Sequence, residues 1–247
     1  MGLVESGTFQ VEAVVEASHW WFVGRRRLFS AEIERRGLKR NARVLDVGTS
    51  TGTNLRMLRD IGFSNVEGLD LNPEAIQYCA EKGLGTVTRG DVTNMPFEDA
   101  RFDLVLATDI IEHVDDDSRA LAEIARVLKP GGTALITVPA FQSLWGLQDR
   151  VAQHKRRYRR PQLIERTRRA SLLVRRCYYF NYLLFVPILA ARRLIDLFRV
   201  QANSEAEFNS PAVNRALSGI FTMDIMTAPH INPPFGVSLL ALVEKPN

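Results

Sequence analysis

The sequence contains little cysteine and little histidine: two cysteines, Cys79 and Cys177, and four histidines in 247 residues. Two cysteines cannot form a disulfide framework and offer no metal-ligand spacing, so we expect a reducing compartment and no metal site. The chain lacks a positively charged start followed by an apolar run, so no secretory signal is predicted. The longest apolar stretch, residues 178–191, is interrupted by Asn181 and Pro187 and is shorter than the ~20 residues that span a bilayer.

The composition is that of a globular protein, but the charge is unevenly distributed. Hydrophobic residues make up 46% and charged residues 24% of the chain, which excludes wholesale disorder and fibrous repeats. Residues 1–150 carry 17 Lys and Arg against 22 Asp and Glu, whereas residues 151–247 carry 15 against 6. An acidic body with a basic, Arg-rich flank should attract anions to that flank.

Residues 43–140 alternate short apolar runs with helical patterns. Such repeated strand–helix–strand units predict an α/β fold with a mostly parallel, doubly wound sheet and right-handed crossovers. Pro73 and Gly83 bound one helix at its favoured first position and at its stop. The expected strands are 43–48, 65–70, 86–91, 102–108 and 133–139, and the expected helices are 53–61, 73–82 and 118–128.

The flanks of this core are less regular. We expect helices over residues 10–40 and over 182–198, the second bent at Pro187. Strands are predicted at 172–180 and 237–244, a basic tract at 154–176 and polar loops at 201–235. The chain should therefore form a single domain made of an N-terminal helical segment or lid (1–42), a ligand-binding core (43–140) and a region that completes the sheet (141–247), with a helical insertion before the last strand.

The first predicted strand ends in a turn of small residues, Asp46-Val47-Gly48-Thr49-Ser50-Thr51-Gly52. A phosphate loop requires a lysine after its last glycine, and none is present; the spacing also differs from that of a dinucleotide turn. The turn still lets a ligand approach the backbone beside unpaired N–H groups at the helix start. Asp46 would repel a pyrophosphate but can accept a hydrogen bond from an ammonium group. The expected ligand therefore has a cationic amino-acid end and no phosphate.

Two further aspartates end the next two predicted strands. Asp70 is placed to accept both hydroxyls of a ribose, and Asp91 can accept from an exocyclic amine such as that of adenine. A single aspartate after a strand is more often a helix cap or a turn former. Three carboxylates at the carboxyl ends of consecutive parallel strands instead match the edge where open α/β sheets bind ligands. Amino acid, ribose and adenine together describe S-adenosylmethionine.

Residues 43–140 resemble the class I S-adenosylmethionine-dependent methyltransferases, in particular their type 11 branch, which includes methyltransferases of quinone biosynthesis. The matching motifs are Val44-Leu45-Asp46-Val47-Gly48, Gly68-Leu69-Asp70, Gly90-Asp91-Val92-Thr93-Asn94-Met95-Pro96-Phe97, Phe102-Asp103-Leu104-Val105 and Leu128-Lys129-Pro130-Gly131-Gly132. The resemblance implies a seven-stranded Rossmann-like sheet. One position departs from the pattern, because the family usually has glycine where this chain has Ser50. The serine Cβ narrows the allowed backbone angles, which predicts slightly weaker cofactor binding.

The resemblance also implies how the cofactor would be held. The methionine end would lie on Asp46, Gly48, Ser50 and Gly52. The ribose and adenine would lie on Asp70 and Leu71, with the adenine also on Asp91 and Val92. Thr108 and Asp109 would line the floor near the sulfonium.

Three residues are candidates for acid–base chemistry. His113 follows the fourth strand on the cofactor rim, where it could remove a proton, orient the substrate or simply pack and cap a helix. His154 and Tyr158 lie past the fifth strand, where the family commonly builds its acceptor pocket, although their basic tract could equally be a solvated surface helix. His19 and the tryptophans that follow it could belong to the lid or to the core.

The predicted function is methyl transfer from S-adenosylmethionine to a small or lipid-linked acceptor, at oxygen or carbon. Residues 154–200 combine basic and aromatic apolar segments, which suits an anionic membrane surface, a dimer contact or a pocket wall. The predicted location is the cytoplasm, including the inner membrane face, and nucleic acid is not expected as a partner. The alternatives are a non-catalytic cofactor-binding module and, less favoured by the turn, a nicotinamide-dependent oxidoreductase.

Overall fold

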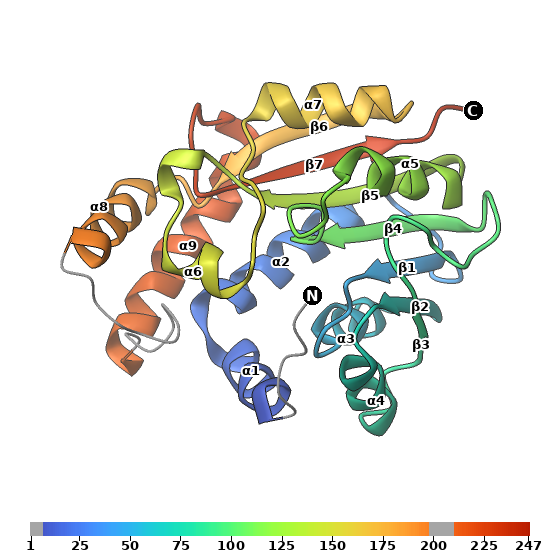
Figure 1. Cartoon of the computed structure of the whole chain (residues 1–247), viewed down its shortest axis with the longest axis horizontal. Coiled ribbons are helices and arrows are strands. Elements are labelled where there is room, and N and C mark those ends of the chain that lie inside the picture. The colour runs from blue at the N-terminus through green and yellow to red at the C-terminus, as the bar shows by residue number, and fades with distance from the viewer. Residues whose placement is uncertain (1–6, 198–209) are drawn as a thin grey trace.

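A computed structural model of the chain describes residues 7–197 and 210–247 and contains a seven-stranded sheet of order β3-β2-β1-β4-β5-β7-β6 (Figure 1). The strands are β1 (Arg43–Val47), β2 (Asn65–Asp70), β3 (Thr86–Arg89), β4 (Phe102–Thr108), β5 (Leu128–Pro139), β6 (Leu173–Phe180) and β7 (Ser238–Glu244). The helices are α1 (Gly7–Ser18), α2 (Trp20–Glu34), α3 (Thr53–Asp60), α4 (Pro73–Glu81), α5 (Asp117–Val127), α6 (Leu147–Val151), α7 (Arg160–Arg169), α8 (Phe185–Leu197) and α9 (Pro211–Ile231), with a short 3₁₀ turn η1 at Gln142–Leu144.

Strands β1 to β5 pair in parallel, and β7 runs antiparallel between β5 and β6. The central strands are apolar on both sides because helices cover both faces, which confirms the predicted doubly wound sheet with a helical insertion before its last strand. The fifth strand begins earlier than predicted, at Leu128, because its pairing with β4 continues across a register shift between Phe102 and Leu104. The strand order changes direction between β1 and β4, so a crevice is expected there. The carboxyl ends of the parallel strands β1, β2 and β4 lie at that edge of the sheet.

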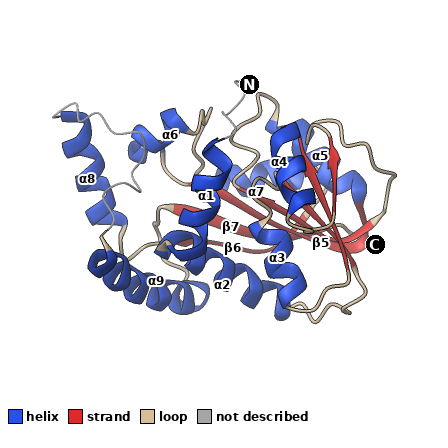
Figure 2. Ribbon diagram, turned by 90° about the horizontal axis from the view of Figure 1, so that it is seen from below, coloured by secondary structure: helices blue, strands red, loops and turns tan. Residues whose placement is uncertain are grey.

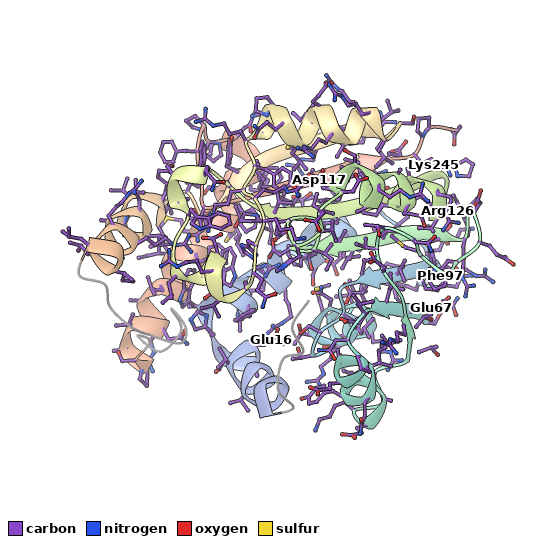
Figure 3. The ribbon with its side chains drawn as sticks, in the orientation of Figure 1. Glu16, Glu67, Phe97, Asp117, Arg126 and Lys245 are labelled. Carbon is purple, nitrogen blue, oxygen red and sulfur yellow. The ribbon has the colours of Figure 1, made fainter. Side chains whose placement is uncertain are left out.

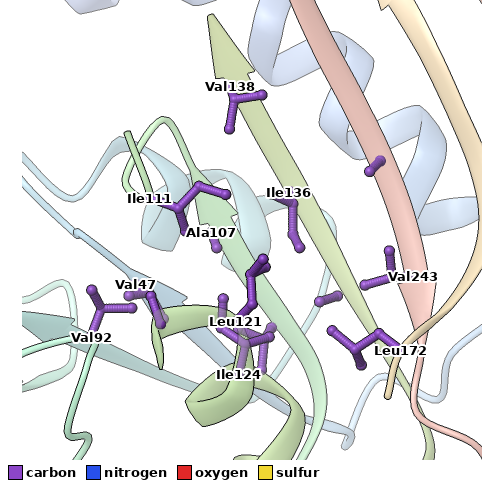
Figure 4. Close-up of a cluster of buried hydrophobic side chains, with 14 of the residues drawn as sticks. Val47, Val92, Ala107, Ile111, Leu121, Ile124, Ile136, Val138, Leu172 and Val243 are labelled. Carbon is purple, nitrogen blue, oxygen red and sulfur yellow. The ribbon is translucent and has the colours of Figure 1, made fainter. Parts of the chain in front are cut away.

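Two hydrophobic clusters lie on the two faces of the sheet. One packs α5 and α7 against the central strands. Its side chains include Leu121 and Ile124 of α5 (Figure 4) and Leu163 of α7. The other packs α2, α3 and α9 against the opposite face (Figure 2), with Phe29 and Phe221 among its fully buried side chains. The N-terminal segment therefore shares the core of the sheet.

The prediction of polar loops at 201–235 is wrong for residues 211–231 and right for residues 232–235. Residues 211–231 form α9, a long helix that begins with Pro211 in its first turn behind the N-cap Ser210 and includes Pro229 near its end. Proline is tolerated in the first turn because the N–H it lacks has no partner there. Residues 198–209, which hold the rest of that stretch and the end of the predicted 182–198 helix, lie outside the described residues.

The tryptophans at the start of α2 pack in the core. Trp21 stacks on Phe180 with ring centroids 5.9 Å apart, and both Trp20 and Trp21 contact Phe221. Within 7–197 and 210–247, none of the helices has the length and hydropathy needed to cross a bilayer.

Candidate functional site

The turn between β1 and α3 has three residues in the left-handed region. Gly48 has φ 75°, Ser50 has φ 46° and Gly52 has φ 74°. Gly48 also has no room for a side chain, since a Cβ there would lie 2.7 Å from Ile110 Cδ1. Ser50 is the strained position, because a non-glycine residue adopts this conformation only at a cost.

Asp46 lies in β1 and is fully buried. The Asn54 side-chain N–H donates to Asp46 Oδ1 and to Thr108 Oγ1, both at 3.0 Å, while Asp46 Oδ2 has no hydrogen-bond partner among the described residues. Burial raises the pKa of Asp46 to about 8; the Asn54 bond opposes the rise, and the charges of Asp70 and Glu16 reinforce it. The carboxyl group is therefore protonated at pH 7 in the ligand-free protein, and a cation bound beside it would favour its ionised form.

Helix α1 contributes a carboxylate that the sequence did not predict for the site. Glu16, labelled on α1 in Figure 3, is buried and accepts a hydrogen bond from Thr51 Oγ1 in the turn before α3. Burial raises the pKa of Glu16, and the Thr51 bond opposes the rise. Glu16, Asp46 and Asp70 together surround the turn with acidic groups.

Asp70 and Asp91 both order their own turns, as the turn-former alternative predicts. Asp70 accepts the Ser50 N–H on Oδ2 and the Asn72 N–H on Oδ1, each at 2.8 Å. Asp91 Oδ1 accepts the Thr93 N–H and hydroxyl, also at 2.8 Å. Carboxylate oxygens have further lone pairs, so both groups can still accept a ligand hydroxyl or amine.

The hydrophobic neighbours of these aspartates differ in exposure. Leu71 is 37% exposed, so its side chain is open to a ligand. Val92 is buried in the core cluster that contains Val47 and Leu69, so its backbone N–H is the group it could offer.

Asp109, at the end of β4, is held by an arginine from α2. Arg25 Nη2 lies 2.5 Å from Asp109 Oδ2, and Thr137 Oγ1 donates to Asp109 Oδ1 at 3.1 Å. The Arg25 guanidinium also lies over the rings of Trp21 and Phe29 at 5.4 and 5.2 Å. The sequence did not indicate this arginine, because its contact with β4 arises only when α2 packs on the sheet.

The two candidate histidines come together. The rings of His113 and His154 meet edge to face with centroids 4.7 Å apart, and His154 Nδ1 lies 2.9 Å from Asp149 Oδ1. Burial and the neighbouring His154 lower the pKa of His113 to about 4, so that imidazole is neutral at pH 7. Beside them, burial and the charge of Asp109 raise the pKa of Glu112 well above its usual range.

The prediction that Tyr158 lines the acceptor pocket is corrected by its position. Its side chain is 2% exposed, and its hydroxyl donates to Asp117 Oδ2 at 2.7 Å; Figure 3 labels Asp117 beside α5. Burial and the hydrogen bond to Asp117 raise the pKa of the phenol far above its usual value. This hydroxyl fastens the 154–160 loop to α5.

The start of the basic tract is not a solvated surface helix. Residues 154–159 precede α7, and Arg157 is buried with its Nε 2.7 Å from Asp149 Oδ1. Arg156 and Arg166 pair with Asp117. Much of the positive charge predicted to attract an anionic ligand therefore neutralises carboxylates of the acidic body.

A cavity of about 930 Å³ lies between α1, α2, α3 and α4 and adjoins the turn that connects β1 to α3. Thr51 and Thr53 form part of its wall, together with Arg26, Arg56 and Lys82. This volume is in the range of small-molecule pockets.

Residues 45–136 match the family model described as a methyltransferase domain. The chain is 42% identical over 100 residues to phthiotriol/phenolphthiotriol dimycocerosates methyltransferase 1 of Mycobacterium ulcerans, a match that covers 38% of this chain and 36% of that protein. It is 34% identical over 116 residues to demethylmenaquinone methyltransferase of Chlorobaculum tepidum, covering 46% of this chain and 48% of that protein. The chain thus spans between a third and a half of the length of these relatives.

Solved structures share the fold over most of the chain. The [4+2]-cyclase SpnF superimposes with a TM-score of 0.60 at 25% identity, covering 90% of this chain and 80% of that one. The phosphoethanolamine N-methyltransferase 2 of Haemonchus contortus, solved with phosphomonomethylethanolamine and S-adenosylhomocysteine, gives a TM-score of 0.57 at 21% identity, covering 88% of this chain and 52% of that one.

Proposed function

Since residues 45–136 belong to the class I S-adenosylmethionine-dependent methyltransferase domain family, we propose that the chain transfers a methyl group from S-adenosylmethionine to a small, lipophilic or lipid-linked acceptor, at oxygen or carbon. The match to the methyltransferase domain supports the choice of cofactor. We propose the activity itself, the acceptor, the location and the roles of individual residues.

The proposal depends mainly on the turn between β1 and α3, which is surrounded by acidic residues and lacks the lysine of a phosphate-binding loop. Asp46 is buried with one oxygen unpartnered, and Glu16 and Asp70 add negative charge around it. A ligand that carries an ammonium group and no phosphate would donate a hydrogen bond to the unpartnered oxygen of Asp46. Its positive charge would also reduce the repulsion among the three acidic side chains. S-adenosylmethionine has that chemistry, whereas the pyrophosphate of a nicotinamide dinucleotide would increase the repulsion.

The proposed roles follow the strand ends. Asp46 and the turn Gly48, Ser50 and Gly52 would hold the methionine end; Asp70, Leu71, Asp91 and Val92 would hold the ribose and adenine; Thr108 and Asp109 would line the floor near the sulfonium. The cofactor supplies a methyl group on a good leaving group, so the protein contributes mainly by alignment. Helix α1, which reaches the turn through Glu16, would act as the lid.

Oxygen or carbon acceptors must also lose a proton. His113 and His154 are the groups we propose for this step, because both lie near the Asp109 turn and His154 is oriented by Asp149. An imidazole with Nδ1 bonded to a carboxylate presents Nε2 as the proton acceptor.

A lipophilic acceptor is supported by two observations. Several relatives of this domain are named for lipids or quinones, among them the phytyl-hydroquinone and sterol 24-C methyltransferases. In addition, α8 at the outer edge of the molecule (Figure 1) exposes Val186, Leu194 and Leu197. Residues 185–197 are thus proposed to meet the acceptor's membrane, at its cytoplasmic face.

Calorimetry of the purified chain tests the proposal. We expect heat on titration with S-adenosylmethionine and S-adenosylhomocysteine and none with NADH; Asp70→Ala should weaken the first two. Because Asp70 also bonds the Ser50 N–H, the melting temperature of the variant must be compared with that of the wild type. Heat with NADH alone would support the oxidoreductase instead.

Turnover separates the enzyme from a non-catalytic binding module. S-adenosylhomocysteine release should accompany methylation of quinol or lipid acceptors supplied in vesicles. Cofactor binding without turnover on O-, C- or N-nucleophiles would favour the binding module. The cyclase among the structural neighbours has the same fold, which is consistent with reaction type being decided by the site and not by the fold.

A further inference from the structure

Glu112, His113 and His154 form a compact cluster beside the Asp109 turn. The first two follow β4, and the third comes from the loop between α6 and α7. One ligand atom from each side chain lies within 4.8 Å of the other two. The Lys155 N–H donates to the Glu112 carbonyl at 2.9 Å, which fixes the loop against the turn.

The Glu112 carboxylate is unusually placed. It is fully buried, and within the described part of the chain neither of its oxygens has a hydrogen-bond partner. Buried carboxylates are normally paired, hydrogen-bonded or bound to a cation. One of its oxygens lies within 4.8 Å of a ring nitrogen of each histidine.

His154 is oriented in the way that metal-binding histidines are. Its Nδ1 lies 2.9 Å from Asp149 Oδ1, which leaves Nε2 available. Asp149 is itself held by Arg157 and by the Gly146 N–H. A carboxylate behind the distal ring nitrogen fixes the tautomer and strengthens the imidazole as a ligand.

We propose that Glu112, His113 and His154 bind one divalent first-row transition-metal cation. Two imidazoles and one carboxylate suit Zn²⁺, Mn²⁺, Fe²⁺ or Co²⁺ better than Mg²⁺ or Ca²⁺, which prefer oxygen ligands. Ligand atoms around a tetrahedral Zn²⁺ lie about 3.4 Å apart, a spacing below the 4.8 Å within which the three ligand atoms lie. Three protein ligands leave positions open for water or for an acceptor oxygen.

The sequence predicted no metal site because the third ligand lies far along the chain from the Glu-His pair. The inference is independent of the proposed methyl transfer, since metal binding is measured without donor or acceptor. It does refine that proposal: with the cation bound, the two imidazoles would be ligands and no longer proton acceptors. An acceptor hydroxyl on the cation would then release its proton to water more easily.

Titration of the chelator-treated chain with Co²⁺ tests the site. We expect one Co²⁺ per chain with visible d–d absorption, and a higher melting temperature with Zn²⁺. Glu112→Gln and His154→Gln should each weaken Co²⁺ binding by at least about tenfold. His230→Ala, which removes an exposed histidine of α9, should leave binding unchanged.

Circular dichroism establishes that each variant is folded, and Glu112→Gln keeps the size of the side chain while it removes a buried charge. The site is refuted if folded wild-type protein shows no Co²⁺ absorption, or if both ligand variants retain it. Displacement of Co²⁺ by equimolar Mg²⁺ would overturn the metal class. Loss of methyl transfer with intact Co²⁺ binding would count only against the proposed function.

Discussion

Among single residues, Asp46 should give the proposed cofactor site a specific pH dependence. Its pKa is raised from 3.8 to about 8, so the folded, ligand-free protein holds this proton at pH 7. A cationic ligand favours the ionised form, and binding should therefore release a proton. Affinity for S-adenosylmethionine should rise by up to about tenfold per unit between about pH 6 and 7, where the ligand's α-ammonium stays charged.

Calorimetry in two buffers of different ionisation enthalpy measures this proton release. Asp46→Asn keeps an acceptor for Asn54 but cannot ionise, so its binding should be weaker and independent of pH. In the ligand-free protein, rising pH has the opposite effect and lowers folding stability. The contribution of Asp46 to stability is greatest below the pKa of this residue in the unfolded chain and is lost as pH rises toward about 8. Equal pH profiles for variant and wild type would exclude this role of Asp46.

Ser50 is the second residue with a testable consequence. Its φ of 46° is unfavourable for serine, so Ser50→Gly should raise stability by up to about 1 kcal/mol and tighten cofactor binding. Ser171→Gly is a matched control, because that exposed serine has φ 60° between α7 and β6. It should stabilise the fold without changing affinity. Weaker cofactor binding by Ser50→Gly would contradict the prediction.

The strand ends and the small-residue turn that we propose to hold the cofactor could be located from the sequence because they are local signals. Arg25, Glu16 and Asp149 could not, since each reaches the site or its neighbourhood from an element that packs there only in the folded chain. Tyr158 was misplaced for a related reason: the sequence put it after β5 but gave no sign that Asp117 would bury its hydroxyl.

At the level of elements, α9 holds the chain where β6 ends. The carboxylate of Asp224 is fully buried and accepts the Asn181 N–H at 2.6 Å and the Leu183 N–H at 2.8 Å. Asp224→Ala would leave the buried Asn181 N–H unpaired, so we expect a loss on the order of 3 kcal/mol. Thermal unfolding should shift down by roughly 10 °C.

Glu165→Ala is the control for that measurement. Glu165 and Arg169 are exposed partners on α7, and such surface pairs contribute less than about 1 kcal/mol. Similar losses for both variants would mean that Asp224 does not hold the turn.

The same helix shows where element prediction failed. The strands of the core were found because runs buried on both faces are almost wholly apolar, as in β4. The prolines and polar residues within 211–231 predict loops, yet Ser210 followed by Pro211 is a helix-start signal. The position of α9 against α2 depends on aromatic packing around Phe221, which periodicity does not encode.

For the molecule as a whole, the separation of acidic and basic residues along the sequence becomes pairing in space. Arg156 and Arg166 meet Asp117, Arg157 meets Asp149, and Arg176 meets Glu32. The basic flank is thus largely a set of internal counter-charges, and its net charge overstates its attraction for anions. Any membrane contact must depend mainly on exposed apolar side chains.

Vesicle flotation tests that contact. Val186, Leu194 and Leu197 are 65%, 53% and 73% exposed and lie toward one side of α8, with Arg193 between them. The chain should float with anionic vesicles, and Val186→Glu with Leu194→Glu should abolish flotation. Leu173→Glu, at the far end of β6 and 46% exposed, introduces one negative charge elsewhere and should have no effect. Because most arginines of the flank are paired internally, high salt should weaken binding only in part. Equal flotation by all three proteins, or none by the wild type, would assign the α8 face to another partner.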